Sequence, residues 1–462
     1  MSVTRGDNVE EMIMELFKEK KFTQLKAELM EQMPADIAVL FEQIEEHERP
    51  RFFRVMPKEL ASEVFTLLDS DLQEELICAF SDREIREIMD EMFMDDAVDI
   101  IEEMPANVAK RILRQADSAT RSLINRLLAY PEDSAGSIMT TEYVDLKKTM
   151  TVADAFTRIR QIGLDSETVY TCYVTDSRRK LLGIVTVREL LLSPTDSLIE
   201  DIMETNVIFA NTMDDKESVA NLFERYDFLA LPVVDNEDRL VGIVTVDDAI
   251  DVLQEEMTED IEKMAAITPS EKAYFKTGVW RTFWVRIPWL MLLMISATFT
   301  GIIIGSFETT LAENVAYGIA LTCFMPMIMG TAGNSGSQAS VTIIRSLSLG
   351  EVEYHDIFRI IWKELRVASL CGVALGVVNV GKVLLVDNLM LGRDYSLPVI
   401  LVISITLVAT VILAKFIGCS LPIVAKRIGF DPAIMASPLI TTIVDALSLI
   451  LYFQIAVMVL GI

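Results

Sequence analysis

The order of apolar and polar positions divides the chain into three regions, and the first, residues 8–130, has a helical pattern. Short apolar runs recur there at spacings of i, i+3 and i+4, which is typical of amphipathic helices. Three runs begin alike, with "MPADIAVL" from Met33, "MPKELASEVF" from Met56 and "MPANVAKRIL" from Met104. Because no single short helix can bury its own apolar face, this repeat predicts an all-α superhelical domain over residues 1–130.

A strand pattern follows, and it occurs twice. The segments "VYTCYVTDSRRKLLGIVTVREL" (169–190) and "FLALPVVDNEDRLVGIVTVDDAI" (228–250) each combine a β-branched strand, a polar turn, a second strand and the start of a helix. The two units resemble cystathionine-β-synthase (CBS) domains, which implies tandem α/β CBS domains at residues 131–200 and 201–253. The acidic segment 254–278 predicts a connecting helix.

The third region contains five apolar stretches, each near the 20 or so helical residues that cross a membrane. They predict an all-α membrane domain of five transmembrane helices over residues 279–462, at 284–306, 314–345, 365–386, 397–420 and 434–460. Basic residues gather in the loops after the second and fourth stretches, which places the N-terminus in the cytoplasm and the C-terminus outside. The start of the chain lacks the apolar core of a signal peptide. We therefore expect a multi-pass protein of a bacterial cytoplasmic (inner) membrane.

Charge separates the first two regions from the third. Residues 1–275 hold 29 basic and 59 acidic side chains, a net charge of −30, and residues 276–462 hold 12 and 10, a net charge of +2. Such acidity argues against a nucleic-acid partner and favours a cationic one, including a metal ion. The cysteines are scattered, and His47 and His355 are too few for a His-rich zinc site. The sequence has no Gly-rich phosphate loop, nucleophile–base pair or haem motif, so we expect no enzyme.

A carboxylate, Asp445, stands inside the fifth apolar stretch. A charge at that depth costs several kcal/mol unless it faces a cavity or a partner. Two interpretations are open: Asp445 lines an ion pathway, or it forms a structural pair with Lys382 of the third stretch. Lys382 lies near the outer end of its span, where it can reach the headgroups, and this favours the ion pathway. Thr441, Thr442 and Ser448 share the helical face of Asp445 and make it polar.

The second apolar stretch contains the polar segment "CFMPMIMGTAGNSGSQAS" (323–340). Pro326 removes a backbone donor, and the recurring glycines permit close helix approach or local unwinding. Asn334, Ser335 and Gln338 place side-chain oxygens at membrane depth. Packing of small residues with polar contacts is one interpretation. A pore lining is better supported, because freed carbonyls are tolerated only where they face protein or water.

A dense acidic run, "VDDAIDVLQEEMTEDIE" (246–262), precedes the membrane region. A solvated helix face is the ordinary explanation of such a run. Here Lys263 alone offers local neutralisation, and the run lies directly before the expected pore. We therefore interpret it as a regulatory metal-binding segment.

The order of an acidic helical domain, paired CBS units, an acidic connecting helix and five spans resembles the MgtE family of magnesium channels. "GNSGSQ" in the second span and "DPAIMASPLITTIVDALS" in the fifth are similar to the family's pore motifs, with Ala332 as one departure where glycine is more usual. The resemblance covers nearly the whole chain. It implies a homodimer with a pore on the twofold axis, lined by the second and fifth spans. It implies Asp445 as the selectivity site, with Asn334, Thr441 and Ser437 as further pore residues.

The same resemblance implies two sets of ligand-binding residues in the soluble regions. A magnesium-sensing surface would comprise Glu63, Asp95, Asp99, Glu217, Asp227, Asp248, Asp251, Glu256, Glu259, Asp260 and Asp431. ATP is a candidate ligand of the CBS pair, at Tyr170, Arg188, Glu189, Phe228 and Pro232. Thr245 and Asp248 suit ribose hydroxyls, and they equally suit capping of the helix that follows the strand.

Together with the resemblance, these observations predict a homodimeric, magnesium-selective channel that imports Mg2+ and is closed by Mg2+ bound to its acidic cytoplasmic domains. Mg2+ gives up its inner waters reluctantly, so a selective pore should recognise the hydrated ion through carboxylate, hydroxyl and carbonyl oxygens. The alternatives are a CBS-gated transporter of another divalent cation (Mn2+ or Co2+), a CBS-gated anion channel, and a nucleotide-sensing module with a membrane anchor. An acidic pore residue disfavours the anion channel, and an anchor has no need of Asp445.

Overall fold

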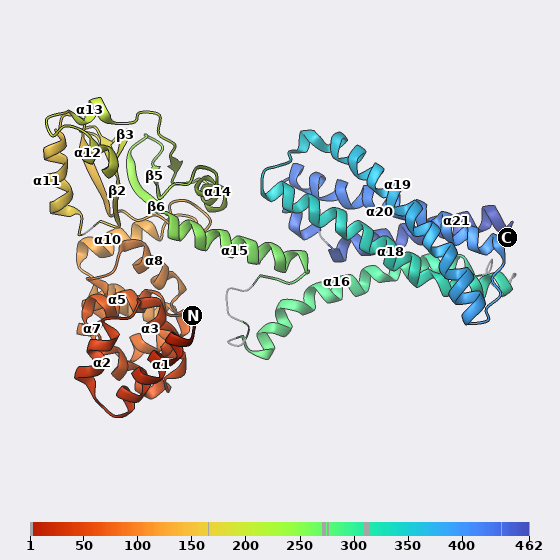
Figure 1. Ribbon diagram of the computed structural model, residues 1–462, viewed down its shortest axis with the longest axis horizontal. Coiled ribbons are helices and arrows are strands. Elements are labelled where there is room, and N and C mark those ends of the chain that lie inside the picture. The colour runs from red at the N-terminus through yellow and green to blue at the C-terminus, as the bar shows by residue number, and fades with distance from the viewer. Residues whose placement is uncertain are drawn as a thin grey trace. The chain divides into compact units, whose positions relative to one another are not determined.

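The computed structural model describes residues 3–164, 166–269, 274, 277–308, 315–435 and 437–461. The chain forms two compact units, Met1–Leu253 and Gln254–Ile462 (Figure 1). The first unit combines helices with two three-stranded sheets, and the described part of the second is helical. The predicted sequence of an all-α domain, an α/β pair and an all-α apolar domain is confirmed.

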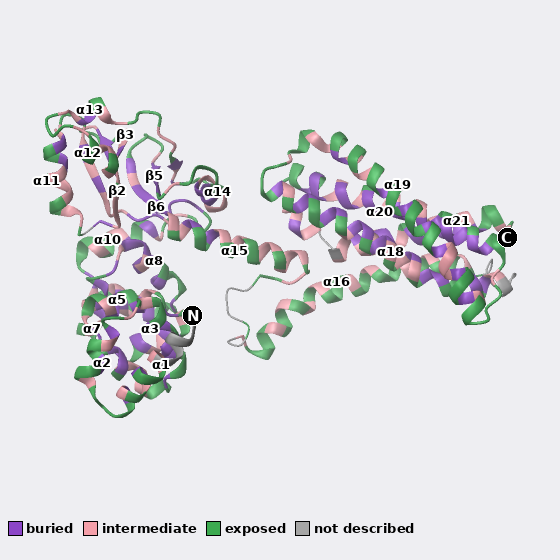
Figure 2. Cartoon of the chain, viewed as in Figure 1, coloured by how far each residue is buried: buried purple, intermediate pink, exposed green. Residues whose placement is uncertain are grey.

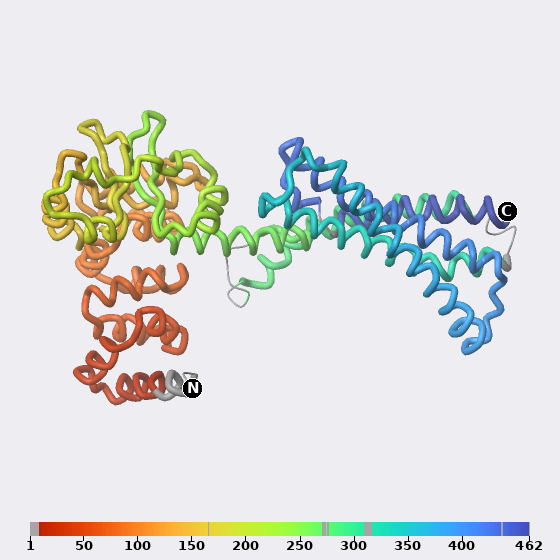
Figure 3. Tube along the Cα trace, turned by 45° about the horizontal axis from the view of Figure 1, so that its top comes forward, coloured from red at the N-terminus to blue at the C-terminus, as the bar shows by residue number. Residues whose placement is uncertain are grey.

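The N-terminal part of the first unit is a stack of short helices. They are α1 (Val3–Lys18), α2 (Phe22–Leu29), α3 (Pro34–Gln43), α4 (Arg49–Phe53), α5 (Lys58–Thr66), α6 (Ser70–Ala79), α7 (Asp82–Met89), α8 (Met94–Glu103), α9 (Ala106–Gln115) and α10 (Ser118–Leu127). α3 packs on α5, α5 on α7 and α7 on α9, while α4 packs on α6 and α6 on α8. Every second helix is therefore a neighbour, and the stack grows in layers (Figure 3). Aromatic rings such as Phe41, Phe53 and Phe65 meet at steep angles in the shared core.

Caps and prolines explain where these helices begin. Pro34 is the first residue of α3, where its missing N–H costs no hydrogen bond. Ser81 and Glu84 form a capping box at the start of α7. Asp117 accepts hydrogen bonds from two backbone N–H groups at the start of α10. New helices therefore begin at short intervals along the chain, as a stack of small helices requires.

The rest of the first unit holds two similar α/β domains. The first contains β1 (Tyr143–Lys147), α11 (Val152–Ile162), β2 (Thr168–Thr175), β3 (Leu181–Thr186), α12 (Val187–Leu192) and α13 (Ile199–Ile202). The second contains β4 (Ala210–Asn211), α14 (Lys216–Tyr226), β5 (Ala230–Val234), β6 (Leu240–Thr245) and the first turns of α15 (Val246–Met264). In each sheet the first two strands are parallel and the last two antiparallel. The predicted pair of units is confirmed.

Each of these domains is completed by a segment that precedes the other. Thr140 pairs with β6, and Glu204 pairs with β3. A Cβ at Gly183 would lie 2.6 Å from Glu204 O, and a Cβ at Gly242 would lie 2.6 Å from Thr140 O. The glycine of each "GIVTV" strand is therefore needed for close backbone approach.

The second unit consists of the end of α15 and a set of long helices. They are α16 (Val279–Ser306), α18 (Val315–Ser348), α19 (Ile357–Lys382) with the π-helix Val383–Met390, α20 (Leu397–Arg427) and α21 (Ser437–Leu460), with a 3-10 turn at Pro432–Met435. α20 packs against α18, α19 and α21 and has buried residues along its length (Figure 2). α16 contacts α21 and buries none of its residues. Its apolar side chains thus face outward, as contact with lipid or a second subunit requires.

Four of the described helical segments are long and apolar enough to cross a membrane: Val279–Ser306, Tyr354–Met390, Leu397–Arg427 and Pro432–Leu460. They correspond to the first, third, fourth and fifth expected spans. The second expected span begins at residue 314, outside the described residues, and otherwise falls on α18. α18 is a helix of 34 residues but is not among the four. The count of five spans therefore stays a prediction.

The polar segment 323–340 is not unwound. α18 is helical throughout, with Pro326 inside it, so local unwinding is the wrong interpretation of its glycines, and close helix approach is the right one for Gly333 and Gly336. A Cβ at Gly336 would lie 3.0 Å from Ile440 Cγ2 of α21 and 3.2 Å from Ala414 O of α20. The glycine face of α18 is where three helices meet.

Candidate functional site

Asp445 lies on α21 against this glycine face. A Cβ at Gly333 would stand 3.6 Å from Asp445 Oδ1 and 3.2 Å from Thr441 Cγ2. The Asp445 carboxylate and Thr441 therefore pack against the backbone of α18 at Gly333. The next residue of α18, Asn334, has an exposed side chain. Asp445 is half-buried, and it has no ion pair or hydrogen bond with another residue in the described part of the chain.

Lys382 is engaged elsewhere, so the structural pair of Lys382 with Asp445 is wrong. The Lys382 Nζ lies 2.7 Å from Asp387 Oδ2 and 5.0 Å from the centre of the Phe324 ring. The π-helix that follows α19 carries Asp387, so a short-range contact satisfies Lys382 at the end of its own helix.

The hydroxyls near Asp445 differ in what they can offer. Thr441 and Thr442 each donate a hydrogen bond to Pro438 O, at 2.9 and 3.0 Å. Their oxygen lone pairs are therefore free to accept, which suits the waters of a hydrated cation. Ser448 follows Asp445 by three residues on the continuous helix α21, as the predicted shared face requires, but it is fully buried. The side chain of Ser437 lies outside the described residues.

In the first unit, carboxylates from four places in the chain form what we call the α8 acid cluster. Its members are Asp95, Asp96 and Asp99 of α8, Glu142 before β1, Glu167 before β2, and Asp247 and Asp248 of α15. Burial first, and then the charges of the neighbouring carboxylates, raise the pKa of Glu167 to about 9 and the pKa of Asp96 to about 6. The same causes raise the pKa values of Asp95 and Asp248. Asp99 is exposed at the edge of the cluster, and the burial of its carboxyl group together with the charges of Asp248 and Asp95 raises its pKa as well.

The α8 acid cluster has the donor chemistry of a magnesium site. Asp95 is 6% exposed, and Glu167 Oε2 is buried without a hydrogen-bond partner in the described part of the chain. Among the described residues, no three His, Cys, Asp or Glu side chains converge closely enough to ligate one ion directly. Mg2+ retains several waters and is held by one or two carboxylates, so the cluster fits a hydrated ion.

Three of the predicted sensor residues, Asp95, Asp99 and Asp248, thus come together. Sequence reasoning missed Glu142 and Glu167. Each precedes a strand of the first sheet, and β1 and β2 are parallel, so both acids lie at one edge of that sheet. Their positions before adjacent parallel strands are the signal that could have identified them.

Other predicted ligands lie apart from this cluster. Glu63, Asp227 and Asp251 are exposed, and Glu217 and Glu256 are half-buried. Asp227 ends α14 with a left-handed backbone, φ 55°. Burial and the charge of Asp247 raise the pKa of Asp251, which is the link between this group and the α8 acid cluster.

The second unit brings Glu259, Asp260 and Asp431 together around Lys263. The Lys263 Nζ lies 2.6 Å from Glu259 Oε1 and 2.7 Å from Asp431 Oδ2. Ser348 Oγ donates to Asp260 Oδ2 at 3.3 Å. Burial acts to lower the pKa of Lys263, but its hydrogen bonds to Asp431 and Glu259 outweigh burial and raise it. We call these four residues the Lys263 cluster.

The predicted nucleotide residues lie on both CBS domains. Tyr170 is 65% exposed on β2, and Arg188 is exposed on α12. Pro232 is buried in β5, a strand that contacts β2, and Phe228 stacks on Tyr226 with ring centres 5.4 Å apart.

Two of the carboxylates near that region already cap helices. Glu189 Oε2 accepts hydrogen bonds from Thr186 N and Oγ1 at 2.8 and 2.9 Å. Thr245 Oγ1 donates to Asp248 Oδ2 at 2.5 Å. For Thr245 and Asp248 this is the contact that the capping interpretation predicts.

A buried ion pair within the apolar helices escaped sequence reasoning. Lys415 Nζ of α20 lies 3.5 Å from Glu364 Oε2 of α19, and Lys415 is 7% exposed. Less than one turn further along α20, a Cβ at Gly418 would lie 2.2 Å from Gly336 O. Lys415 lies inside the fourth expected span, and this was the signal from which a buried ion pair could have been predicted.

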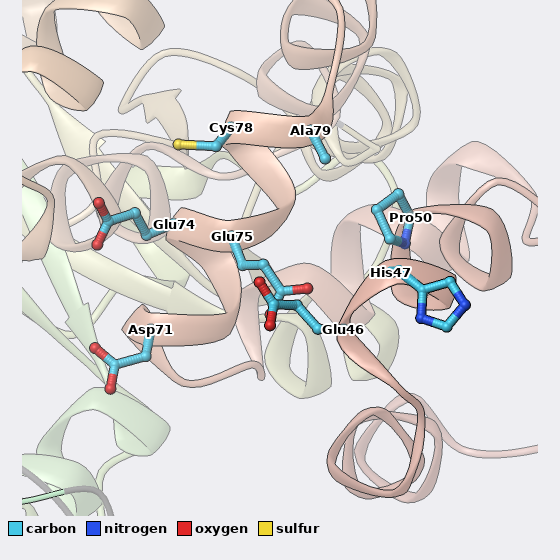
Figure 4. Close-up of a pocket in the computed structure, with 8 residues that line it drawn as sticks. All are labelled: Glu46, His47, Pro50, Asp71, Glu74, Glu75, Cys78 and Ala79. Carbon is cyan, nitrogen blue, oxygen red and sulfur yellow. The ribbon is translucent and has the colours of Figure 1, made fainter.

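An open hollow of about 940 Å³ lies on the helical domain (Figure 4). It is lined by Glu46, His47, Pro50, Asp71, Glu74, Glu75, Cys78 and Ala79. Figure 4 shows that the side chains of His47 and Cys78 point in opposite directions, so the hollow does not gather them as metal ligands.

Apolar helices with an unpaired carboxylate, joined to a CBS pair and an acidic helical domain, are features that suit a membrane cation transporter. Family models agree: "Divalent cation transporter" matches residues 325–455, "MgtE intracellular N domain" matches 32–133, and "CBS domain" matches 135–194 and 199–255. The chain belongs to the MgtE family of magnesium transporters, which are membrane proteins.

Similar proteins cover nearly the whole chain. The magnesium transporter MgtE of Thermus thermophilus is 35% identical over 96% of this chain and 97% of its own length. The magnesium transporter MgtE of Bacillus subtilis is 34% identical over 96% of this chain and 95% of its own length. Among solved structures, the crystal structure of the cytosolic domain of the Mg2+ channel MgtE in complex with ATP superposes with a TM-score of 0.51 at 35% sequence identity. The match covers 53% of this chain and 99% of the solved chain. The soluble part of a magnesium transporter is 28% identical with a TM-score of 0.52, covering 54% and 99%.

Proposed function

We propose that the chain forms a homodimeric channel that imports Mg2+ across the bacterial cytoplasmic membrane. Asp445 carries this proposal: it lies within an apolar helix, against bare backbone, without a counter-charge in the described part of the chain. Family membership supports Mg2+ as the ion. The basic loops favour a cytoplasmic N-terminus and an external C-terminus.

The pore would recognise the hydrated ion. Asp445 supplies charge, Thr441 supplies a hydroxyl oxygen whose proton is already donated to Pro438 O, and the exposed Asn334 supplies an amide. Twofold symmetry doubles each group around one axis. Two carboxylates facing a hydrated divalent ion discriminate against monovalent ions better than one does, because each added charge raises the attraction to the divalent ion twice as much. Ser437, at the start of α21, completes the proposed pore residues.

Closure would begin at the α8 acid cluster. Without a cation, each pair of ionised carboxylates 4 Å apart would cost about 4 kcal/mol at an effective dielectric of 20, and the raised pKa values of the cluster reflect this cost together with burial. A few such contacts exceed the roughly 5.5 kcal/mol that moves a two-state element from 1:99 to 99:1. Mg2+ bound between α8 and the start of α15 removes the repulsion and holds the helical domain on the second CBS domain.

The same helix continues to the Lys263 cluster, where Glu259 and Asp260 meet Asp431. Mg2+ there would hold the end of α15 against the membrane domain and keep the pore shut. We retain Glu63, Glu217, Asp227, Asp251 and Glu256 as candidate ligands of further regulatory ions.

ATP is the proposed second ligand of the CBS pair. The solved relative in complex with ATP supports this. Tyr170 and Arg188 are exposed on the first CBS domain. Phe228 and Pro232 belong to the second, where Phe228 precedes β5 and Pro232 lies on it, and β5 contacts β2. Glu189 would contact ATP only by giving up its hydrogen bonds to Thr186.

Flux assays on purified protein in liposomes test the pore. Asp445→Asn keeps the shape and removes the charge, and Asp445→Ala removes both; each should abolish Mg2+ influx while the dimer persists. Asp394→Asn, an exposed carboxylate outside the helices, is the matched control and should conduct normally. Normal selective flux in both Asp445 variants would contradict the proposal, and faster flux of Mn2+ or Co2+ than of Mg2+ would favour the other divalent cations.

A further inference from the structure

The Lys263 cluster contains a cation that belongs to the chain itself. The ammonium group of Lys263 lies between a carboxylate of its own helix, Glu259, and one of another element, Asp431, at 2.6 and 2.7 Å. Asp431 Oδ1 accepts from Ala433 N at 2.8 Å, so its other oxygen is directed to the lysine. Asp260 experiences both charges, because Asp431 raises its pKa and Lys263 lowers it, with burial the largest cause of the net rise.

Helix geometry explains only half of this arrangement. Glu259 and Lys263 are four residues apart, and such a pair forms on many exposed helices with an energy of about 0.3–0.5 kcal/mol. The contact with Asp431 is different, since it joins α15 to the segment between α20 and α21. The lysine thus occupies, with a single charge, the same oxygens that we propose as ligands of Mg2+.

We propose that Lys263 is a tethered competitor of regulatory Mg2+ and sets the Mg2+ concentration at which the channel closes. The inference rests on the proposed function, in which Mg2+ on these acids closes the pore. Glu259 and Asp431 cannot serve the ammonium and a hydrated Mg2+ through the same oxygens at once. Mg2+ must displace the ammonium, so the lysine weakens apparent Mg2+ binding and keeps the channel open at higher Mg2+.

The test measures influx into liposomes containing the full-length protein, with Mg2+ varied on the cytoplasmic side. Lys263→Met keeps the stem of the side chain and removes its charge. We expect it to lower the half-inhibitory Mg2+ concentration about fivefold, which corresponds to about 1 kcal/mol. Lys263→Arg retains the charge and should stay within twofold of the wild type.

Lys426→Met is the matched control. Lys426 Nζ donates to Leu347 O at 3.0 Å, so this variant removes a positive charge from the same unit without freeing a carboxylate. It should leave the half-inhibitory concentration unchanged. An equal shift in Lys426→Met assigns the effect to net charge and overturns the proposal.

The remaining outcomes also test the role of Lys263. An unchanged or higher half-inhibitory concentration in Lys263→Met overturns the inference, as does a variant that Mg2+ no longer closes, since Lys263 would then be needed for closure. If Lys263→Met does not assemble, Lys263→Gln replaces it, and the Mg2+ midpoint of thermal stabilisation provides a second measurement with the same expected factor. Failure of the proposed function is distinguishable from failure of this inference, because in that case cytoplasmic Mg2+ would not close even the wild-type channel.

Discussion

Gly333 of α18 and Asp445 of α21 are in direct apposition: a Cβ at residue 333 would stand 3.6 Å from Asp445 Oδ1. The distance from that Cβ to Thr441 Cγ2, 3.2 Å, is tighter than ordinary van der Waals contact. The missing side chain at Gly333 is therefore what allows the Asp445 carboxylate to lie this close to α18.

Gly333→Ala should lower Mg2+ influx several-fold, because the added methyl moves α21 or turns the carboxylate. Gly333→Val should abolish influx. Gly330→Ala is the control one turn earlier, where nothing lies within 4 Å of the added methyl, and its better helix propensity should leave flux intact and stability equal or higher. Equal flux in all three variants would show that the crossing does not position Asp445.

The α8 acid cluster predicts a pH dependence of stability. The pKa of Glu167 is about 9 in the folded chain against an ordinary value near 4.3, so the folded state binds more protons than the unfolded one. Stability is then fully present below about pH 4 and lost as pH rises through the folded pKa. We expect the melting temperature of a 1–253 fragment in EDTA to fall between pH 5 and pH 9.

Two comparisons isolate this effect. Glu167→Gln should raise the melting temperature at pH 8 by about 2–4 °C, equivalent to about 1 kcal/mol, and should flatten the pH profile. Saturating Mg2+ should flatten the wild-type profile as well, since a bound cation stabilises the ionised form. Parallel profiles for wild type and variant would mean that Glu167 ionises freely.

Lys415 and Glu364 predict a coupled loss of stability. Lys415→Met leaves a buried carboxylate without its partner and should destabilise the membrane domain by about 3 kcal/mol. The double variant Lys415→Met, Glu364→Leu should regain most of that loss, because an apolar pair can replace a buried ion pair. Thermal unfolding in detergent, analysed as a double-mutant cycle, measures the coupling. Additive losses would contradict it.

The apolar periodicity was enough to predict most of the elements, because helix and strand faces follow from the local spacing of apolar residues. Partners separated along the chain were not predictable in this way. That the acidic run on α15 binds a regulatory metal ion stays a prediction, and the contact of Lys263 with Asp431 depends on how the end of α15 lies against the segment between α20 and α21. Glu142 and Glu167 likewise join α8 only through the parallel pairing of β1 with β2. The pair of Lys382 with Asp387 was also not predicted, because Asp387 lies on a π-helix, which local pattern does not reveal.

Gating is tested by removing the sensor charges from both clusters. The quadruple variant Asp95→Asn, Asp99→Asn, Asp248→Asn, Glu259→Gln removes the mutual repulsion together with the ligands. Influx should lose its dependence on cytoplasmic Mg2+, with the half-inhibitory concentration raised about tenfold or more. The resting state is not determined by charge alone, because both the force that opens the channel and the ion that closes it are lost. Limited proteolysis gives a second measurement: Mg2+ should protect segment 130–278 of the wild type and have little effect on the variant.

Net charge is the competing explanation, and the acidic hollow on the helical domain supplies its control. Neutralising Glu45, Glu46, Asp71 and Glu74 changes the charge by the same amount, and these residues lie at or beside the hollow and outside both clusters. Screening by salt limits the reach of such surface charges to about 8–10 Å, so this variant should close at the wild-type Mg2+ concentration. If the control loses its Mg2+ dependence while the cluster variant keeps it, the sensor lies at the hollow and not at the α8 acid cluster. If both variants close normally, the acids of the two clusters are solvated surface, and Mg2+ acts at the pore itself.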